Sequence, residues 1–425
     1  MENHRLVVGL EGHRGGLADS RGLLRELRDH AVLEAIFRNG PITRPEIAVV
    51  AGLSKPTVSA AIRRLEQAGL VEAAGLRPGA RGRTPVAYVV SDTVGFVIGC
   101  DVGGTNVRVA TSDLFGEEIA ALTNRTSKGG GREVIHQIIE MVAGVIDRSA
   151  GNGRPLALGI SVPGLVDQTT GFTSMAYNVT PEGDFDPAPP IRERFEIPVI
   201  VENNVNLAAV GEKWFGLARG VTTVVFIQIG AGIGMGMIVD GEIVRGAHGA
   251  AGEIAYLPLT GDPFDPRHRR HGGLEDEIAE AGILAAFAQR RSGDRHAARY
   301  ADGGSAVTVE EVFALAEAGD PDARAAVENV ASRLGAAIAA VCAIVDPDLV
   351  VLGGGIGSNP LLLRPVRSAA AALLPITVRI ETTMLRDRAA LKGALAVALQ
   401  EARDALLTET GESTGSRVDS ADSSH

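Results

Sequence analysis

Cysteine and aromatic residues are scarce in this chain. Its 425 residues include two cysteines, Cys100 and Cys342, and aromatic side chains make up 4%. Both cysteines lie in apolar segments far apart in the sequence, which indicates buried small side chains and not a disulfide or a metal cluster. A chain without a disulfide framework is typical of a reducing compartment, so we expect a cytoplasmic protein.

Long apolar runs are also missing. The longest candidate, LGAAIAAVCAIVDPDLVVLGGG, is interrupted by Asp346 and Asp348, whereas a membrane-spanning helix needs roughly 20 consecutive apolar residues. The first residues contain no apolar run of signal-peptide length. We therefore expect no membrane partner.

Charge is distributed unevenly along the chain, whose net charge is -11. Residues 1–92 hold 13 Lys and Arg against 10 Asp and Glu, while the remainder holds 28 against 42. A mildly basic segment joined to an acidic one favours a nucleic-acid-binding module on a sensor or enzyme, because attraction to phosphates is local to the binding face.

The length and the changes in pattern predict four segments. They are an arm (1–25), a helical head (26–92), a body of two halves divided near residue 200 (93–407) and a polar tail (408–425). Within the body, strand-like runs such as FVIGCDV, LALGISV and TTVVFIQIG alternate with helical stretches. This alternation predicts an α/β fold.

The head has the pattern of a winged helix-turn-helix. Thr43 and Glu46 have capping-box spacing for a short second helix, and Ser54 can cap a third one. Two extended runs flank a basic loop from Leu76 to Gly82, as strands flank a wing. In such a motif the start of the last helix meets base edges while basic residues meet phosphates. The predicted DNA-contacting residues are Ser54, Lys55, Thr57, Ser59, Arg63, Arg64, Arg81 and Arg83.

This pattern predicts double-stranded operator DNA as a partner, read by a homodimer or homotetramer, because two-fold proteins read paired half-sites. A helical dimerisation module with solvated arginines, or a scaffold that binds neither DNA nor sugar, is disfavoured. The caps, the turn and the basic loop occur together and in order.

Three glycine-rich loops, each after a strand-like run, predict a phosphate-binding architecture in the body. Glycine lets a phosphate approach the backbone, and an aspartate at a strand end can hold Mg²⁺. We expect no required cofactor, although bound ATP with Mg²⁺ is compatible with these loops. The nucleotide-loop candidates are Asp101, Gly103, Gly104, Thr105, Gly230, Gly232, Gly234, Gly354 and Gly355.

Several motifs in the body resemble those of the ROK family of repressors and sugar kinases. The resemblance covers about residues 30 to 400 and includes GISVPGLVD, VENNVNLAAVGE, RGAHGAAGE and GGLE, which occur in the family's order. The resemblance implies a two-lobed, actin-like ATPase fold behind the winged helix-turn-helix. It also implies a sugar site formed by Asn178, Asn203, Asn204, Glu253, Tyr256 and Glu275.

Two departures from the family's kinases change the expected activity. The catalytic aspartate of those kinases falls on Asn204, and an amide cannot act as a general base. Their zinc ligands fall on Tyr256, Pro266, His268 and Gly273, so zinc is not expected. His268 and His271 alone do not make a metal site, and we predict none.

The sequence thus predicts a sugar-responsive transcription regulator, a repressor of carbohydrate uptake or catabolism genes, whose body binds a sugar and has lost kinase activity. The alternative is an ATP-dependent sugar kinase, or a dual-function protein, with a fused DNA-binding head. The retained Asp101 and the glycine loops favour that alternative, and Asn204 opposes it.

Overall fold

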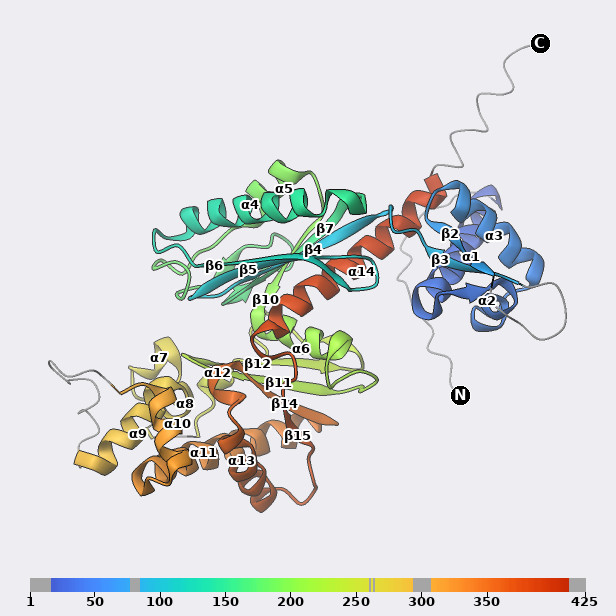
Figure 1. Ribbon diagram of the computed structural model, residues 1–425. Coiled ribbons are helices and arrows are strands. Elements are labelled where there is room, and N and C mark those ends of the chain that lie inside the picture. Colours follow the sequence, from blue (N-terminus) through green and yellow to red (C-terminus); the bar gives the residue numbers. More distant parts are fainter. Residues whose placement is uncertain (1–16, 77–84, 260, 263, 293–306, 413–425) are drawn as a thin grey trace, which may run out of the picture. The chain divides into compact units, whose positions relative to one another are not determined.

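The computed structural model describes residues 17–76, 85–259, 261–262, 264–292 and 307–412 (Figure 1). The chain forms two compact units. One unit, the head, takes in the described residues up to Gly95, with Asn152–Arg154 and the end of the chain from Glu401. The other, the body, comprises Phe96–Gly151 and Pro155–Gln400.

Three helices build the head, α1 (Leu17–Asn39), α2 (Arg44–Val50) and α3 (Lys55–Gln67). The capping box predicted for α2 is present, because Glu46 accepts hydrogen bonds from the backbone and hydroxyl of Thr43, each 2.8 Å long. Helix α1 begins at Leu17, within the segment 1–25 that the sequence predicted as an arm preceding the head. Gly22 and the exposed Leu24 and Leu27 interrupt its apolar period, so the pattern did not mark its first turns.

A small antiparallel sheet completes the head, in the order β1-β3-β2. Apolar residues from all three helices, such as Ile36, Ile47, Ile62 and Leu65, are fully buried together with Val90 of the sheet. The residues between β2 and β3, where the wing was predicted, lie outside the described chain from 77 to 84. The strands are β1 (Ile42–Thr43), β2 (Val71–Leu76) and β3 (Val86–Val90).

The last turns of helix α14 (Ala389–Glu412) belong to the same unit as the head. There, the guanidinium carbon of Arg403 lies 4.6 Å from the centre of the Phe37 ring of α1. Ala402 and Leu406 on the same turns are buried. Segments from both ends of the chain therefore contribute to this unit.

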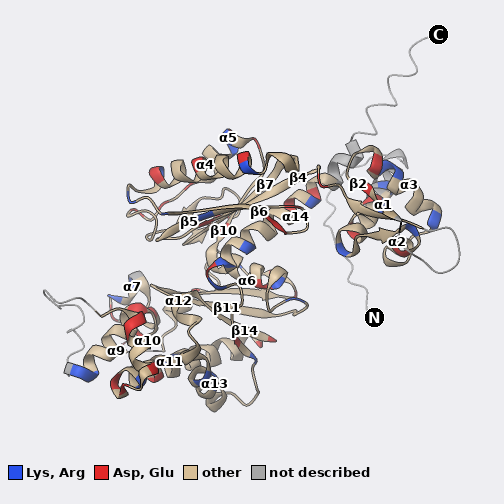
Figure 2. Ribbon diagram, viewed as in Figure 1, with Lys and Arg blue, Asp and Glu red and all other residues tan. Residues whose placement is uncertain are grey.

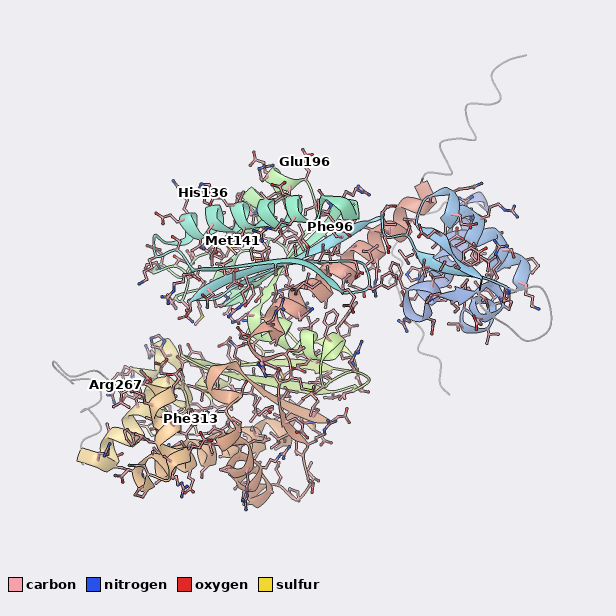
Figure 3. All side chains as sticks on the ribbon, viewed as in Figure 1. Phe96, His136, Met141, Glu196, Arg267 and Phe313 are labelled. Atoms are coloured by element: carbon pink, nitrogen blue, oxygen red, sulfur yellow. The ribbon has the colours of Figure 1, made fainter. Side chains whose placement is uncertain are left out.

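The first lobe of the body is a five-stranded sheet in the order β10-β7-β4-β5-β6. Helices α4 (Gly131–Arg148) and α5 (Ala188–Phe195) cover one face, where Phe96 and Met141 lie in the core (Figure 3). Strands β4, β5 and β6 are antiparallel, and β7 and β10 are parallel. The strands are β4 (Gly95–Val102), β5 (Asn106–Ser112), β6 (Glu118–Arg125), β7 (Arg154–Val162) and β10 (Val199–Asn203), with a small ribbon of β8 (Leu165–Val166) and β9 (Thr173–Ser174).

The second lobe is another five-stranded sheet, in the order β13-β12-β11-β14-β15. Side chains alternate along its central strand: Val225 and Ile227 face one apolar cluster, while Val224 and Phe226 face another. Its strands are β11 (Val224–Ile229), β12 (Ile233–Val239), β13 (Glu242–Ile243), β14 (Leu349–Gly353) and β15 (Ile380–Thr382).

Helices cover both faces of this second sheet. Helix α11 (Pro321–Val345) is the one described helix long and apolar enough to cross a membrane, but more than half of its apolar window is buried in the lobe. Phe313 packs in the same core (Figure 3). The other helices of the lobe are α7 (His268–His271), α8 (Gly273–Ile278), α9 (Glu280–Ser292), α10 (Val309–Ala318), α12 (Gly354–Gly357) and α13 (Pro360–Leu373), with short 3-10 turns at Ile254–Tyr256 (η2) and Arg386–Arg388 (η4).

Helix α6 (Asn204–Phe215) and the first turns of α14 cross at two glycines. A Cβ atom on Gly211 would lie 2.2 Å from the Ala389 carbonyl oxygen, and one on Gly393 would lie 1.7 Å from that of Leu207. Helix α14 also packs on the first sheet, where a Cβ on Gly159 would lie 2.1 Å from the Ala394 carbonyl oxygen. The body is therefore the two-lobed α/β structure that its sequence predicts, with α14 packed against both lobes.

Candidate functional site

The start of α3 carries the predicted base-reading residues. Ser54 caps the helix, since its hydroxyl accepts a 3.3 Å hydrogen bond from the Thr57 backbone and lies 2.7 Å from the Thr57 hydroxyl. Lys55 is exposed, while Thr57 and Ser59 are half-buried. Figure 2 marks the basic residues on this helix. The cap leaves Lys55 at the solvent-facing start of the helix.

The two arginines farther along α3 differ in their surroundings. Arg63 is exposed, whereas Arg64 donates two hydrogen bonds to Asp29 of α1, at 2.8 and 2.5 Å. Asp29 is buried, so this ion pair holds α1 against α3. Arg64 thus has a structural contact that the sequence did not reveal, in addition to any contact with DNA. Arg81 and Arg83 lie outside the described residues.

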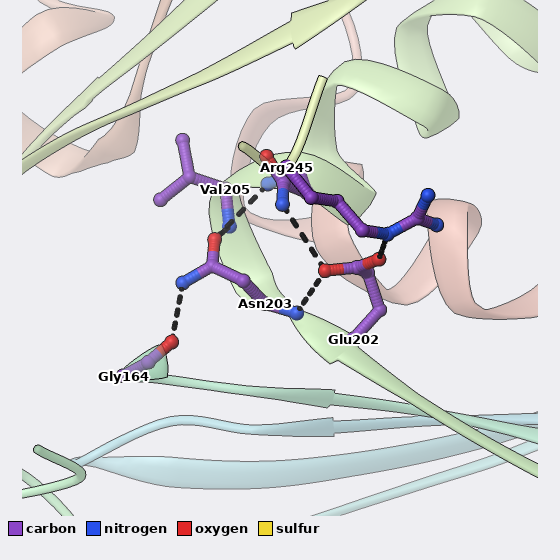
Figure 4. Close-up of polar contacts among 6 residues, drawn as sticks. Gly164, Glu202, Asn203, Val205 and Arg245 are labelled. Atoms are coloured by element: carbon purple, nitrogen blue, oxygen red, sulfur yellow. Dashed lines mark hydrogen bonds and ion pairs between the residues drawn. The ribbon is translucent and has the colours of Figure 1, made fainter. Parts of the chain in front are cut away.

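In the body, Asn203 ends β10 and caps α6. Its side-chain oxygen accepts hydrogen bonds from the backbones of Val205 and Asn206, at 2.8 and 3.1 Å (Figure 4). Its side-chain nitrogen donates a 2.9 Å hydrogen bond to the Gly164 carbonyl. Of the two amide hydrogens, one is left for a ligand, so Asn203 orients the start of α6 at least as much as it can bind sugar.

Glu202 and Arg245 form an ion pair beside this cap, which the sequence reading missed. The Arg245 Nε lies 2.6 Å from Glu202 Oε2, and the Glu202 side chain is 2% exposed (Figure 4). Glu202 also accepts hydrogen bonds from the Asn203 backbone and the Asn206 amide. A carboxylate in a buried strand needs such partners, and this requirement was the signal available in VENNVN. The pair joins the first sheet to the loop after β13.

Asn204 is the first residue of α6 and is half-buried. Among the described residues its side chain has no hydrogen-bond partner. The amide is therefore available to a ligand at the start of the helix. It can donate to and accept from a hydroxyl, but it has no carboxylate to remove a proton.

Three further candidates gather around the short turn η2. Glu253 precedes the turn and Tyr256 ends it, while Glu275 lies in the first turn of α8, which packs against η2. Burial raises the pKa of Glu253, whose carboxylate has no hydrogen bond or ion pair among the described residues. Burial, and then the charges of Glu253 and Glu275, raise the pKa of Tyr256. The structure thus brings these three predicted sugar contacts together.

Glu275 also supports the second glycine loop. Its Oε2 accepts a 3.0 Å hydrogen bond from the Ile233 backbone, and a Cβ on Gly232 would lie 2.6 Å from that oxygen. Burial raises the pKa of Glu275, although the Ile233 hydrogen bond acts in the opposite direction. Asn178 is exposed, and its backbone oxygen lies beside Gly104 of the first glycine loop.

The glycine loops follow strands β4, β11 and β14, as predicted. Gly230 and Gly232 close a turn through a 2.9 Å backbone hydrogen bond, and Gly234 packs on Val205. Gly354 has a φ of +80°, and a Cβ there would lie 2.3 Å from the Ile229 carbonyl oxygen. Gly355 has open space around it. Packing explains Gly234 and Gly354, so these two glycines are not by themselves evidence of a nucleotide.

Asp101 does not offer the free carboxylate that a Mg²⁺-nucleotide needs. It is 7% exposed, and its two oxygens accept hydrogen bonds from the Ser161 hydroxyl at 2.7 Å and from Arg108 at 3.4 Å. Burial raises the pKa of Asp101, and the Ser161 and Arg108 contacts only partly offset this. Mg²⁺ is held by carboxylate and phosphate oxygens. The residues present therefore do not fit a Mg²⁺-nucleotide, and Arg108 is the residue that the sequence reading missed.

A hollow of about 230 Å³ lies where the zinc ligands of related kinases were expected, lined in part by Tyr256, His268 and Gly273. Over the described part of the chain, no cluster of three or more His, Cys, Asp or Glu residues could hold a metal ion. Structural zinc needs four ligands. The expectation that the protein carries no zinc stays a prediction, which elemental analysis would test.

A capped helix-turn-helix and a two-lobed body with amides and carboxylates beside the junction of its lobes define a class of protein. It is a DNA-binding regulator with a sugar-kinase-like sensor. The ROK family matches residues 97–401, and a winged helix-turn-helix DNA-binding family matches residues 25–72. The chain belongs to the ROK family.

Similar proteins of known sequence include regulators and a kinase. A xylose repressor of Caldicellulosiruptor bescii is 26% identical over 89% of this chain and 97% of that repressor. A transcriptional regulator of Mycobacterium tuberculosis is 27% identical, over 94% of this chain and 89% of its own length. A glucokinase of Halalkalibacterium halodurans is 30% identical over 64% of this chain and 83% of the kinase.

Two solved structures share the fold. A ROK family transcriptional regulator, described as a homologue of the Escherichia coli MLC protein, has a TM-score of 0.74 and 23% identity, with 91% of this chain and 99% of that chain covered. A glucokinase from Streptomyces griseus, solved with glucose and AMPPNP, has a TM-score of 0.60 and 25% identity over 72% of this chain and all of that one. The predicted architecture, a winged head followed by an actin-like sugar-kinase body, is confirmed.

Proposed function

We propose that this protein is a sugar-responsive repressor of genes for carbohydrate uptake or catabolism, and that its body binds a sugar without phosphorylating it. The regulators to which it is similar, together with the winged head, support DNA binding and a sugar effector. Asn204 is the observation that carries the second half of the proposal.

The side chains predicted to contact the sugar suit hydroxyl recognition. Asn204, Glu253 and Tyr256 supply donors and acceptors, and a buried sugar hydroxyl needs one of each. Glu253 pays a desolvation cost in the free protein, because it is half-buried without a partner among the described residues. A hydroxyl that donates to this carboxylate would reduce that cost. Sugar binding is thereby favoured at this position.

Phosphoryl transfer lacks two parts in this body. The amide of Asn204 cannot take the proton of an attacking hydroxyl, a contribution of roughly 10²- to 10⁴-fold in rate. Asp101 is already engaged by Arg108 and Ser161. The bound sugar would then act as an effector, which changes DNA affinity only if it binds one arrangement of the protein better than another.

The purified protein can be used to capture genomic DNA fragments, which are then released with a panel of pentoses and hexoses. This experiment tests the proposed sugar-responsive repression. We expect one sugar, or a few related sugars, to release the protein from its operators. The protein is proposed to act in the cytoplasm as a homodimer or homotetramer. Failure of every sugar to change DNA retention would contradict the proposal.

The second candidate is a sugar kinase, or a dual-function protein, with a fused head. The similarity to a glucokinase and the three glycine loops favour it. Sugar-dependent ADP release separates the two candidates. Turnover of roughly 1 to 10³ per second would promote the kinase, whereas release near background with sugar binding seen by calorimetry supports the sensor.

A further inference from the structure

A chain of charged side chains crosses the body between two of its glycine loops. Arg108 lies 3.4 Å from Asp101 and 2.8 Å from Asp387, through different nitrogens of its guanidinium group. Arg388, the residue after Asp387, forms a second ion pair with Glu118. The sequence separates Arg108 and Asp387 by 279 positions.

The ends of this chain lie at the first and third glycine loops. Asp101 and Arg108 are direct partners in the register of β4 and β5, on either side of the Gly103–Gly104 turn. Asp387 lies in η4, which packs against α12, the helix that begins at Gly354. The Arg108 guanidinium therefore spans from the aspartate of one glycine loop to the segment that supports another.

Burial makes this contact hard to exchange for a metal. The Asp101 side chain is 9% exposed and the Arg108 side chain 19%. Removing one member of a buried ion pair leaves an uncompensated charge, which is strongly unfavourable. A Mg²⁺ ion held by Asp101 would have to displace Arg108 from this carboxylate. Asp387 is 70% exposed, so the outer end of the chain is much less constrained.

We propose that Arg108 takes the place of a Mg²⁺-nucleotide in this body, so that the Asp101–Arg108–Asp387 bridge excludes Mg²⁺-ATP and holds the two lobes without it. One consequence rests on the proposed function: the sugar should bind with the same affinity whether or not Mg²⁺-ATP is present.

Calorimetry with the full chain and Mg²⁺-ATP tests the bridge directly, without sugar. Wild-type protein should show no saturable binding up to about 1 mM, the upper end of ordinary enzyme substrate affinities. Arg108→Ala should bind Mg²⁺-ATP at least about tenfold more tightly, and omission of Mg²⁺ should abolish the gain. Arg148→Ala, an exposed arginine at the end of α4, is the matched control and should behave as wild type.

Arg108→Gln keeps the test decisive if Arg108→Ala does not fold, since it removes the charge that pairs with Asp101 but keeps most of the side-chain volume and an amide donor. It should also gain Mg²⁺-dependent binding, by a smaller factor. Saturable wild-type binding of Mg²⁺-ATP below 1 mM would overturn the proposal, and so would variants that bind no better than wild type. A protein that binds neither sugar nor nucleotide would contradict the proposed function while leaving the bridge supported.

Discussion

Arg63 and Arg64 are neighbours in sequence with different predicted tasks. Arg63→Ala should weaken DNA binding and reduce the slope of affinity against salt by about one phosphate contact, with no loss of stability, because its side chain is exposed. Arg64→Ala should destabilise the head by about 2 kcal/mol, less than the roughly 3–5 kcal/mol of a fully buried pair. Salt-dependent DNA retention and amide-exchange protection in α1 and α3 measure the two effects.

Asp29→Asn is the control for this pair, because it removes the charge that Arg64 contacts without touching the DNA-facing side of α3. It should reduce protection in α1 and α3 as Arg64→Ala does. If Arg64→Ala weakened DNA binding but left amide-exchange protection in α1 and α3 unchanged, the Arg64–Asp29 ion pair would not stabilise the head.

The free carboxylate of Glu253 predicts a pH dependence. Because burial raises its pKa in the folded protein, the folded state binds more protons than the unfolded state between the ordinary pKa and the raised one. The stability it contributes therefore falls as pH rises through that window. Glu253→Gln should raise the melting temperature of the sugar-free protein more at about pH 8 than at about pH 5, and should weaken sugar binding.

Thermal scans at the two pH values, with and without the effector sugar, check this prediction. Glu133→Gln is a suitable comparison, since Glu133 is exposed on α4, far from η2 in sequence. An equal change at both pH values would show that Glu253 ionises normally in the folded protein.

At the scale of elements, the crossing of α6 and α14 depends on two glycines whose backbones touch. Gly211→Ala and Gly393→Ala should each destabilise the body by about 3 kcal/mol or prevent folding, because the added methyl group meets a carbonyl oxygen of the opposite helix. Gly151→Ala, in open space, should be tolerated. Thermal unfolding measures all three. Full tolerance at Gly393 would mean that the helices separate easily at this point.

Elements with strong apolar patterns could be predicted from the sequence, and those without could not. FVIGCDV and TTVVFIQIG become β4 and β11, whose residues are almost all buried. Strand β6 was missed because its side chains are largely exposed and polar. Helix α13 carries Pro365 in its interior, which argues against a continuous helix although Asn359 and Pro360 mark its start. Helix α5 has only eight residues, too few to show a helical period clearly.

The candidate site was predictable only in part for a related reason. Motif resemblance identified Glu253, Tyr256 and Glu275, which do gather around η2. It could not show that Asn203 is mostly engaged in capping, or that Arg108 reaches both Asp101 and Asp387. Such contacts depend on pairs of residues that are far apart in the sequence, and no local pattern encodes them.

At the scale of the whole molecule, two heads in an oligomer should read a palindromic site. A duplex with two half-sites should bind far more tightly than one half-site, because a single recognition helix reads few bases. Arg81→Ala with Arg83→Ala should weaken binding and flatten its salt dependence. Titrations on both duplexes at several salt concentrations test this, and equal affinity for one and two half-sites would argue for a monomeric reader.

The packing of Arg403 on Phe37 means that the head is not a contiguous stretch of the gene. A fragment that ends after β3 would leave Phe37 without this cover, and a stop codon after Gln400 would damage the head while sparing every residue of the helix-turn-helix. We expect the truncated chain to lose amide-exchange protection in α1 and to bind operator DNA more weakly. To transfer this head to another sensor, both its N-terminal segment and the end of α14 would have to be joined to that sensor. This requirement limits how such regulators can exchange their DNA specificities.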